Sequence, residues 1–310
     1  MEVHYISLES EVEKKFFNLA IGNFDGVHLG HQKIIRDLVN DANEQKRPSA
    51  ILSFEPHPRQ FFSRDLDRYQ IIGTEIKQKI LNDLGINNLF FLKFNQLIAN
   101  LSPTDFIKKI IIDKLQINKL VVGYDFHFGK NREGDVIMLR DYATIHGFEL
   151  DVIDPIKDES KNEVFSSSAI RAAIKDGILE KANMMLGRPW TMEGEVIHGD
   201  KRAREMNFPT ANILPHDQIY PLKGVYAVNI LVNQSKFKGI ANFGERPTVD
   251  GKKLLLEVHL FDFNEDIYGK HLTVEFLTFI RGEKKFDSFS FLVEQIKKDI
   301  QITKDYHLSK

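Results

Sequence analysis

Cysteine is absent from the 310-residue sequence, and its absence limits the chemistry that the protein can use. Without thiols the chain can have no disulfide framework, no thiolate zinc site and no cysteine nucleophile. No apolar run approaches the ~20 residues that a membrane-spanning helix needs, and the N-terminal segment lacks the apolar core of a signal peptide. We therefore expect a soluble, cytoplasmic protein with no membrane partner.

An excess of positive charge is also missing. The chain carries 42 Lys and Arg against 44 Asp and Glu, which gives a formal net charge of −2 at pH 7. A protein that mainly binds nucleic acid usually carries a basic excess, so the charge balance argues against a nucleic-acid partner. At ~150 residues per domain, the length predicts two domains.

Apolar runs alternate with helical patterns in the first part of the chain. Strands are expected at 16–24, 50–54, 89–94, 120–123 and 150–153. Helices are expected at 32–42, 75–84, 104–115 and 142–147. Strands that alternate with helices predict a parallel sheet that is covered on both faces, and hence an α/β fold.

The pattern changes after about residue 185. A helix is expected over 169–186, with Gly187 as its C-terminal stop. Further strands are expected at 193–198, 225–232, 237–243, 254–261 and 272–279, followed by an amphipathic helix over 289–302. Short strands divided by Gly, Pro and Asn turns predict a barrel or a sandwich. We place the domain boundary so that the domains are 1–184 and 185–310.

The most informative motif lies between the first expected strand and the helix that follows it. It reads Gly22-Asn23-Phe24-Asp25-Gly26-Val27-His28-Leu29-Gly30-His31. Ligands of parallel α/β sheets bind where a strand ends and the next helix begins, and a helix N-terminus attracts phosphate. His28 and His31 share one helical face, so both imidazoles can donate hydrogen bonds to phosphate oxygens. The motif predicts a phosphate site; the alternatives are a plain surface turn or a zinc site, for which no third ligand is evident.

Consecutive hydroxyls mark the start of the helix expected at 169–186. Ser166, Ser167 and Ser168 can cap that helix or bind phosphate. Arg171 lies one turn further on and can neutralise a triphosphate. The alternative is that the serines are only caps and Arg171 is a solvated charge.

A stiff segment follows the second expected strand, because its prolines restrain the backbone. Phe54, Phe61 and Phe62 lie beside these prolines and can frame a flat ligand, or they can belong to the core.

Charged residues in the second domain gather at a turn and inside a strand. Gly199, Lys201 and Arg204 belong to a glycine-containing basic loop that can hold ATP phosphates, and it leads into Pro-Thr-Ala-Asn ending at Asn212. Glu257 interrupts an apolar strand and can act as a base if a hydroxyl lies within hydrogen-bond reach. The alternatives are an exposed basic turn and an edge-strand glutamate that faces solvent.

Taken in order, these segments resemble the bacterial bifunctional riboflavin kinase/FMN adenylyltransferase family, also called FAD synthetases. The string from Gly22 to His31 is similar to the family's His-x-Gly-His signature, and residues 165–171 to its Ile-Ser-Ser-Thr-x-Ile-Arg motif. Residues 123–129 resemble its flavin-contacting loop. The resemblance covers nearly the whole chain. It implies a Rossmann-like N-terminal nucleotidylyltransferase domain and a C-terminal antiparallel β-barrel kinase domain with a terminal helix.

The resemblance also implies roles for individual residues. Catalytic roles fall on His28, His31, Arg171 and Glu257. The nucleotide contacts come from three segments: Gly22, Asn23, Phe24, Asp25, Gly26 and Gly30; Ser166, Ser167 and Ser168; and Gly199, Lys201, Arg204, Thr210 and Asn212. Thr210 and Asn212 are expected at Mg²⁺ and the nucleotide phosphates. The residues expected near the flavin are Phe54, Pro56, Phe62, Asp125, Phe126, Phe128, Arg281 and Phe286. Riboflavin, FMN and ATP are the expected substrates, and flavins are also the products.

Some positions depart from the family pattern. Asp125 stands where many relatives carry Asn, and only Asn can donate a hydrogen bond at neutral pH. Lys201, Ala203 and Asn207 replace frequent glycines in the basic loop. These replacements leave open a monofunctional FMN adenylyltransferase with a weakened kinase domain. A nucleic-acid-related His-x-Gly-His enzyme is the other alternative, which the charge balance disfavours.

Overall fold

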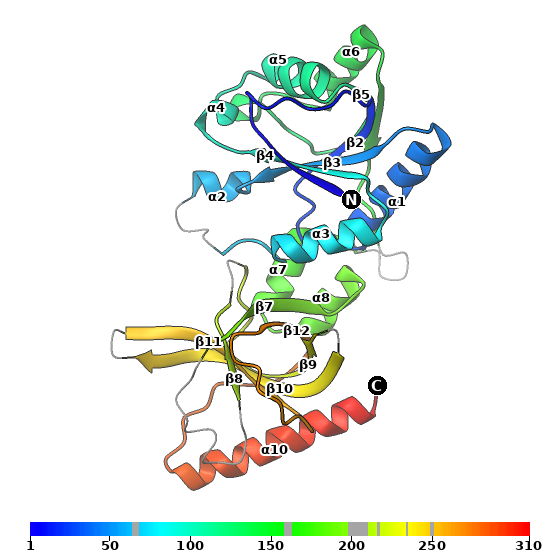
Figure 1. Cartoon of the computed structure of the whole chain (residues 1–310). Helices are drawn as coiled ribbons and strands as arrows, with labels where there is room; N and C mark the ends of the chain where they lie inside the picture. The colour runs from blue at the N-terminus through cyan, green and yellow to red at the C-terminus, as the bar shows by residue number, and fades with distance from the viewer. Residues whose placement is uncertain (64–67, 158–162, 198–209, 216–217, 234, 249–250) are drawn as a thin grey trace. The chain divides into compact units, whose positions relative to one another are not determined.

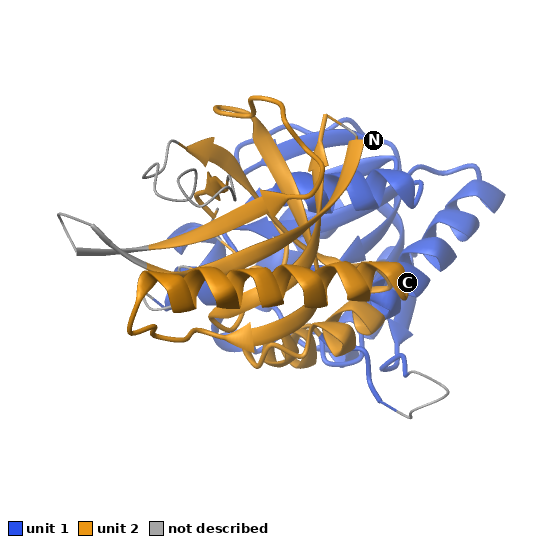
Figure 2. Ribbon diagram, turned by 90° about the horizontal axis from the view of Figure 1, so that it is seen from below, with its two compact units in different colours: residues 1–67, 74–166 blue, residues 68–73, 167–310 orange. Residues whose placement is uncertain are grey.

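The computed structural model describes residues 1–63, 68–157, 163–197, 210–215, 218–233, 235–248 and 251–310. Gly199, Lys201, Ala203, Arg204 and Asn207 of the basic loop lie outside the described residues. Contacts divide the chain into two compact units, which are coloured separately in Figure 2. Unit 1 holds Met1–Asp67 and Thr74–Ser166, and unit 2 holds Arg68–Gly73 and Ser167–Lys310.

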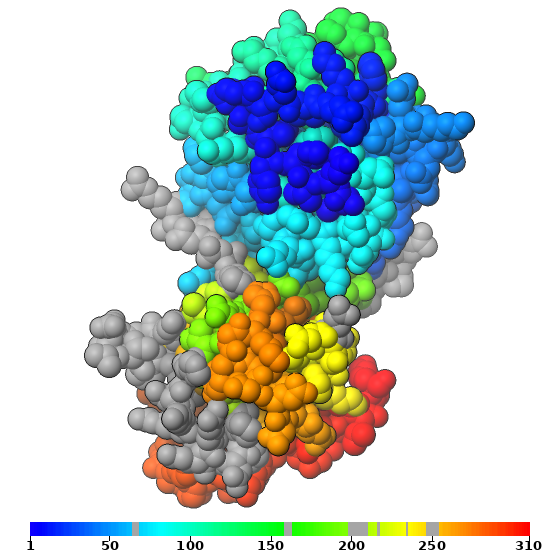
Figure 3. Space-filling view, in the orientation of Figure 1, coloured from blue at the N-terminus to red at the C-terminus, as the bar shows by residue number. Residues whose placement is uncertain are grey.

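Unit 1 is built on a six-stranded sheet in the order β1-β4-β3-β2-β5-β6, and all of its pairings are parallel. The strands are β1 (Glu2–Ile6), β2 (Phe17–Ile21), β3 (Ser49–Glu55), β4 (Asn88–Lys93), β5 (Ile117–Gly123) and β6 (Glu149–Ile153). The parallel sheet expected from the sequence is confirmed. The sequence reading missed β1, an edge strand with mostly polar or half-exposed residues; the first residues of the chain, dark blue in Figure 3, lie on the surface.

Helices cover both faces of this sheet, as Figure 1 shows. The elements are α1 (Leu29–Glu44), α2 (Pro58–Phe62), α3 (Thr74–Asp83), α4 (Gln96–Ala99), α5 (Pro103–Phe106), η1 (Ile107–Lys114), η2 (Lys130–Arg132) and α6 (Val136–His146). Leu19 and Ile21 share one core with side chains of η1 and α6. The intervening Ala20 is equally buried, so β2 packs on both faces, as a central parallel strand does.

The helix expected over 104–115 begins as expected and then changes type. Ser102 caps α5, since its Oγ accepts a hydrogen bond of 3.1 Å from the backbone N–H of Asp105. The chain continues directly into η1, which is a π-helix and not an α-helix. Ile107, Ile110 and Ile111 of η1 are buried in the sheet core, so the wider turn still presents an apolar face.

Unit 2 begins with two helices, where the sequence predicts one continuous helix over 169–186. That prediction is wrong, because α7 (Ser167–Lys175) ends before Gly177 and α8 (Leu179–Leu186) starts after it. Gly177 has a φ of 74°, a left-handed conformation that ends a helix and that glycine adopts without strain. Gly187 ends α8 in the same way, as expected. These helices belong to unit 2, whereas the sequence places the domain boundary between residues 184 and 185.

The strands of unit 2 form a closed barrel in the order β10-β11-β8-β7-β12-β9, which decides between the barrel and the sandwich. They are β7 (Trp190–Ile197), β8 (Ala211–Ile213), β9 (Gly224–Val232), β10 (Ser235–Thr248), β11 (Gly251–Leu260) and β12 (His271–Gly282). Fully buried apolar side chains alternate along these strands and fill the interior: Met192, Ile213, Val228, Ile230, Leu256, Val258, Leu272 and Val274. Binding sites must therefore lie on the outside of the barrel.

The terminal helix α10 (Phe289–Leu308) packs on that outside. Ile300 of α10 contacts a small apolar cluster of Val225, Ile240 and Phe261, which is separate from the barrel interior. The amphipathic pattern predicted for this helix is confirmed, although the helix runs six residues beyond Ile302. Every helix in the described residues is too short or too polar to cross a lipid bilayer.

Candidate functional site

The glycine- and histidine-containing motif lies where the strand order of the sheet reverses. From β2 the chain continues to β3 and β4 on one side, and β5 and β6 lie on the other. The C-terminal ends of β2 and β5 are therefore the edges of a crevice of the type in which open α/β sheets bind ligands. Gly22 follows β2 directly, and Asp125 follows β5 by two residues and is exposed. The structure thus brings Asp125 and the motif to the same edge of the sheet.

His28 and His31 lie ring against ring at the start of α1. The two ring centroids are 3.6 Å apart and the rings are inclined by 18°. His28 is the N-cap residue of α1, and its Nδ1 accepts a hydrogen bond of 3.3 Å from the backbone N–H of His31. The predicted shared face is confirmed, and it is closer than helical spacing alone requires.

Gly30 makes this ring contact possible. A Cβ at this position would lie 3.2 Å from two atoms of the His28 ring and 3.2 Å from the Cβ of Phe165. The short distance to Phe165 shows that the residue before Ser166, where unit 1 ends, packs against the motif.

The turn before α1 is strained. Phe24 and Val27 have φ values of 45° and 40°, in the left-handed region that residues with a Cβ seldom adopt. Both side chains are buried, and a Cβ on Gly22 would lie 3.2 Å from the Phe24 ring. Such conformations cost roughly 1–3 kcal/mol each and persist only where the surrounding packing enforces them. Strain of this kind is typical of turns that must present particular atoms to a ligand.

His31 is uncharged at neutral pH. Burial, and then the neighbouring His28 and Lys77 charges, hold its pKa well below the usual range. Among the described residues, His31 Nδ1 and Asn23 Oδ1 are buried polar atoms without a hydrogen-bond partner. Unpaired buried polar atoms are costly, and two in one turn indicate a ligand that completes their bonding.

Lys77 of α3 is a residue of this site that the sequence reading missed. Its Nζ donates hydrogen bonds of 2.5 Å to the carbonyl oxygen of Asn23 and 2.8 Å to Ser53 Oγ. Burial lowers its pKa to about 8, against the opposing effect of Asp25 and Glu55. Nothing in the sequence separates Lys77 from Lys79 on the same helix, because only the fold brings Asn23 and Ser53 to it.

The aromatic residues proposed for the flavin have different environments. Phe128 is buried in the core of unit 1, where it packs on Phe106 at a centroid distance of 5.5 Å. Phe54 is half-buried against the same core, and Phe126 stacks on Phe128. Phe62 is 68% exposed. Phe62 is thus the ring most accessible to a ligand.

Arg171 is buried, not the solvated helix charge of the alternative reading. It lies in α7 of unit 2, where its Nε donates a hydrogen bond of 3.0 Å to the Tyr69 carbonyl oxygen. Its Cζ lies 3.7 Å from the centroid of the Tyr69 ring. Ser167 and Ser168 form the first turn of the same helix, at the end that attracts anions.

A row of polar residues crosses three neighbouring strands on the outside of the barrel. Asn212 of β8 is opposite Glu257 of β11, and Glu257 is opposite Asn242 of β10. Asn242 Nδ2 lies 3.5 Å from Glu257 Oε2. Glu257 is only 9% exposed and its strand is paired on both sides, so it is not the solvent-facing edge residue of the alternative reading. Asn242 had no chemistry assigned from the sequence.

The donors at this row suit Mg²⁺ bound together with nucleotide phosphates. Thr210 directly precedes β8 and supplies a hydroxyl, while Asn212 of β8 supplies an amide oxygen. These are hard oxygen ligands of the kind that Mg²⁺ prefers, usually with substrate phosphates completing its shell. The described residues contain no cluster of three or more His, Cys, Asp or Glu that would hold a metal without the nucleotide.

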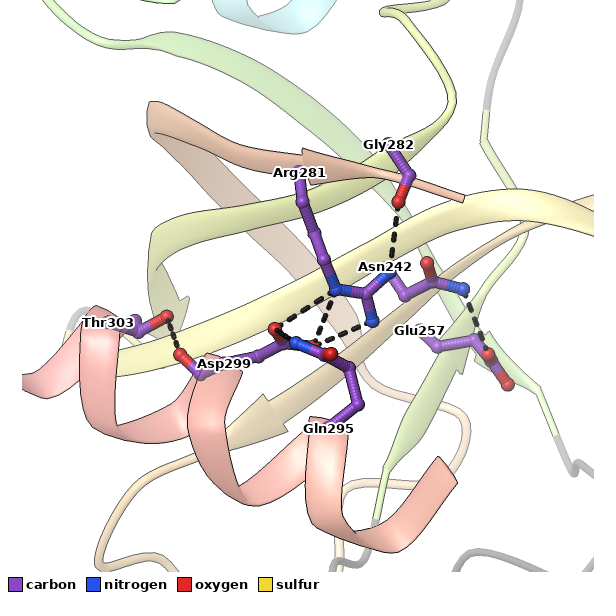
Figure 4. A network of polar contacts seen from close by, with 7 residues as sticks. All are labelled: Asn242, Glu257, Arg281, Gly282, Gln295, Asp299 and Thr303. Atoms are coloured by element: carbon purple, nitrogen blue, oxygen red, sulfur yellow. Dashed lines mark hydrogen bonds and ion pairs between the residues drawn. The ribbon is translucent and has the colours of Figure 1, made fainter. Parts of the chain in front are cut away.

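Arg281 is held by a carboxylate of the terminal helix, as Figure 4 shows. Its Nε and Nη2 donate hydrogen bonds of 3.0 and 2.7 Å to the two carboxylate oxygens of Asp299. Gln295 Nε2 donates a further bond of 2.9 Å to Asp299 Oδ1. The Arg281 Cζ lies 5.9 Å from the centroid of the Phe286 ring. The structure thus joins the two flavin candidates of unit 2, with Arg281 oriented by Asp299.

Comparison with known proteins assigns both units. The family model described as FAD synthetase matches residues 11–169, and the model described as riboflavin kinase matches residues 186–307. A protein of Haemophilus influenzae named bifunctional riboflavin kinase/FMN adenylyltransferase is 40% identical over 294 residues, which cover 93% of each chain. The chain belongs to the bifunctional riboflavin kinase/FMN adenylyltransferase family.

Other relatives agree with this membership. The Bacillus subtilis protein of the same name is 40% identical over 295 residues, 91% of this chain and 90% of that one. A solved structure from Streptococcus pneumoniae, named as a macrolide-efflux protein, has a TM-score of 0.87 and 30% identity. It covers 98% of this chain and 99% of its own. The family fold therefore spans the whole chain, while the efflux name describes that neighbour only.

Replacing Gly30 tests the geometry of the imidazole pair. In Gly30→Ala the new Cβ must displace the His28 ring, while alanine itself favours the helix. We expect kcat/KM for FAD formation from FMN to fall about tenfold or more, because a displaced ring loses its alignment with the reacting groups. FMN formation from riboflavin in the same protein is the control. Wild-type FAD formation in Gly30→Ala would contradict the ring contact.

Replacing Asp299 tests the buried ion pair. Asp299→Asn leaves Arg281 without its charged acceptor in a site where Asp299 is 2% exposed. We expect the free energy of unfolding, measured with denaturant, to fall by about 1–3 kcal/mol. The control is Asp305→Asn on the exposed side of the same helix. Equal stabilities of the two variants would show that the pair contributes nothing.

Proposed function

We propose that this bifunctional riboflavin kinase/FMN adenylyltransferase carries out its two reactions at the two sites described above. Unit 2 phosphorylates riboflavin with ATP to give FMN, and the sheet edge of unit 1 adenylylates FMN with a second ATP to give FAD. In terms of the sequence, we assign residues 1–184 to the adenylyltransferase and 185–310 to the kinase. The stacked imidazoles at the strand-order reversal are the observation that carries the proposal.

In the adenylyl transfer a phosphate oxygen of FMN attacks the α-phosphorus of ATP. A P–O bond to FMN forms, the bond to the β-phosphate breaks, and pyrophosphate leaves. His28 and His31 donate hydrogen bonds to the α-phosphate and to the leaving group, where negative charge grows. A neutral His31 can stack on the His28 ring without charge repulsion. When the negatively charged phosphates bind, they favour protonation of His31.

The triphosphate needs hydrogen-bond donors in addition to the imidazoles. We assign this role to Ser166, Ser167, Ser168 and Arg171, with the turn from Gly22 to Gly26 and Gly30 providing close backbone approach. The flavin contacts assigned to unit 1 are Phe54, Pro56, Phe62, Asp125, Phe126 and Phe128. Phe62 supplies the exposed ring among them.

In the kinase reaction the 5′-hydroxyl of riboflavin attacks the γ-phosphorus of ATP, and ADP leaves. Glu257 accepts the hydroxyl proton, and Asn242 orients the Glu257 carboxylate. Thr210 and Asn212 hold the metal–phosphate unit, and Arg281 with Phe286 borders the flavin. When bound with ATP, Mg²⁺ neutralises phosphate charge, which is the main requirement of phosphoryl transfer.

The histidines are tested by a double variant. His28→Ala/His31→Ala removes both donors, so we expect FAD formation from FMN to fall about 100-fold or more. Starting from riboflavin, FMN should then accumulate, because unit 2 is unchanged. Chromatography of the products measures both steps. Undiminished FAD formation would overturn the assignment of the adenylyl-transfer site.

The kinase assignment is tested by a conservative change. Glu257→Gln keeps the shape of the side chain and removes the base, so FMN formation should fall about 100-fold. FAD formation from added FMN should stay at the wild-type rate. A wild-type kinase rate in this variant would exclude Glu257 as the base. If the wild-type protein itself makes FAD from FMN but no FMN from riboflavin, the chain is the monofunctional enzyme with a weakened kinase domain.

A further inference from the structure

Lys77 stands out among the titratable groups to which the mechanism gives no role. It comes from α3, more than forty residues after the motif, and its ammonium bonds to both the motif and the neighbouring strand. Ser53 Oγ also donates a hydrogen bond of 3.4 Å to the same Asn23 carbonyl oxygen. Each of these three groups therefore hydrogen-bonds to the other two, at the ends of β2 and β3: the Lys77 ammonium, the Ser53 hydroxyl and the Asn23 carbonyl.

This contact holds the beginning of the strained turn. Asn23 immediately precedes Phe24, which is the first residue of this turn with a positive φ. The Asn23 carbonyl belongs to the peptide group that joins the two residues. Fixing that carbonyl fixes the plane of the peptide from which the turn starts. The Phe24 ring contacts the His31 ring at a centroid distance of 5.1 Å, so the turn and the imidazole pair are packed together.

The charge of Lys77 is balanced within the site. Asp25 of the turn and Glu55 at the end of β3 stabilise the ammonium, and the Phe91 ring lies 5.6 Å from it. His31 faces the same ammonium, which disfavours a positive charge on its own ring. Burying an ammonium is energetically costly unless it is well paired. A lysine that remains at such a position, beside a strained turn, therefore indicates a function.

From these contacts we propose that Lys77 is a positioning residue of the adenylyl-transfer site, which acts through the Asn23 carbonyl to hold the turn and the imidazole pair in the reactive geometry. This inference rests on the proposed function. Lys77 makes its contacts with the protein, so its loss should affect the alignment of bound substrates more than their binding.

The test separates kcat from KM in the full-length protein. Lys77→Met keeps the length of the side chain and removes both hydrogen bonds. We expect kcat for FAD formation from FMN and ATP to fall about tenfold or more, while both KM values stay within about threefold of wild type. The matched control is Lys79→Met, an exposed lysine on the same helix. It should retain the wild-type kcat, and the riboflavin kinase step should be unchanged in both variants.

A second readout uses the charge. Because burial lowers the pKa of Lys77 to about 8, kcat/KM for FAD formation should decline as pH rises through that value. In Lys77→Arg the guanidinium keeps its proton and can still donate two bonds, so the decline should move to higher pH. The titratable groups that face the Lys77 ammonium are Asp25, Glu55 and His31, and burial holds the pKa of His31 well below its usual range.

Two results would overturn the proposal. One is an unchanged kcat in Lys77→Met, and the other is a tenfold rise in KM with kcat unchanged, which would make Lys77 a substrate-binding group. If Lys77→Met does not fold, Ser53→Ala is the alternative test, because it removes the hydroxyl that bonds to both Lys77 and Asn23. A lower kcat with a wild-type melting temperature supports the proposal. A wild-type kcat overturns it. Wild-type protein that forms no FAD from FMN would instead contradict the proposed function.

Discussion

The close packing of His28 on His31 is the interaction on which the account of unit 1 depends. A ring centroid distance of 3.6 Å is compatible with two stacked imidazoles only if they do not both carry charge, and desolvation holds the pKa of His31 well below its usual range. The same packing requires a glycine at position 30 and a turn that bends through left-handed residues at Phe24 and Val27. The result is a pair of imidazoles fixed before any phosphate arrives, and preorganised donors are those that stabilise developing charge most effectively.

The barrel obeys a different constraint. Its interior is filled by apolar side chains, so substrates can only be held on the outer surface, beside α10 and the surrounding loops. Asn212, Glu257 and Asn242 meet there because strand register places them opposite one another, although they are far apart in the sequence. Asp299 of α10 fixes Arg281 on the outside of the barrel, so the terminal helix orients one of the residues proposed for the flavin.

The sequence was enough to predict the parallel sheet of unit 1, the strand-rich unit 2 and the shared face of His28 and His31, because each has a local signal: alternation of strands and helices, short strands divided by turns, or a glycine-lined turn. It could not reveal Lys77, Asn242 or Asp299, whose partners come from other elements and are defined only by tertiary packing. The prediction of one continuous helix at 169–186 was wrong because the apolar pattern continues across Gly177, whereas the backbone of Gly177 adopts a left-handed conformation. Phe128 lies in the core of unit 1 whereas Phe62 is exposed, a difference that aromatic content alone cannot reveal.

The most direct test of the central claim is a crystal structure of the protein with a non-hydrolysable ATP analogue and FMN. The account predicts the α-phosphate within hydrogen-bond distance of the His28 and His31 rings, with the turn from Gly22 to Gly26 against the triphosphate. Nucleotide bound elsewhere in unit 1, with both imidazoles still stacked and without phosphate contact, would contradict it.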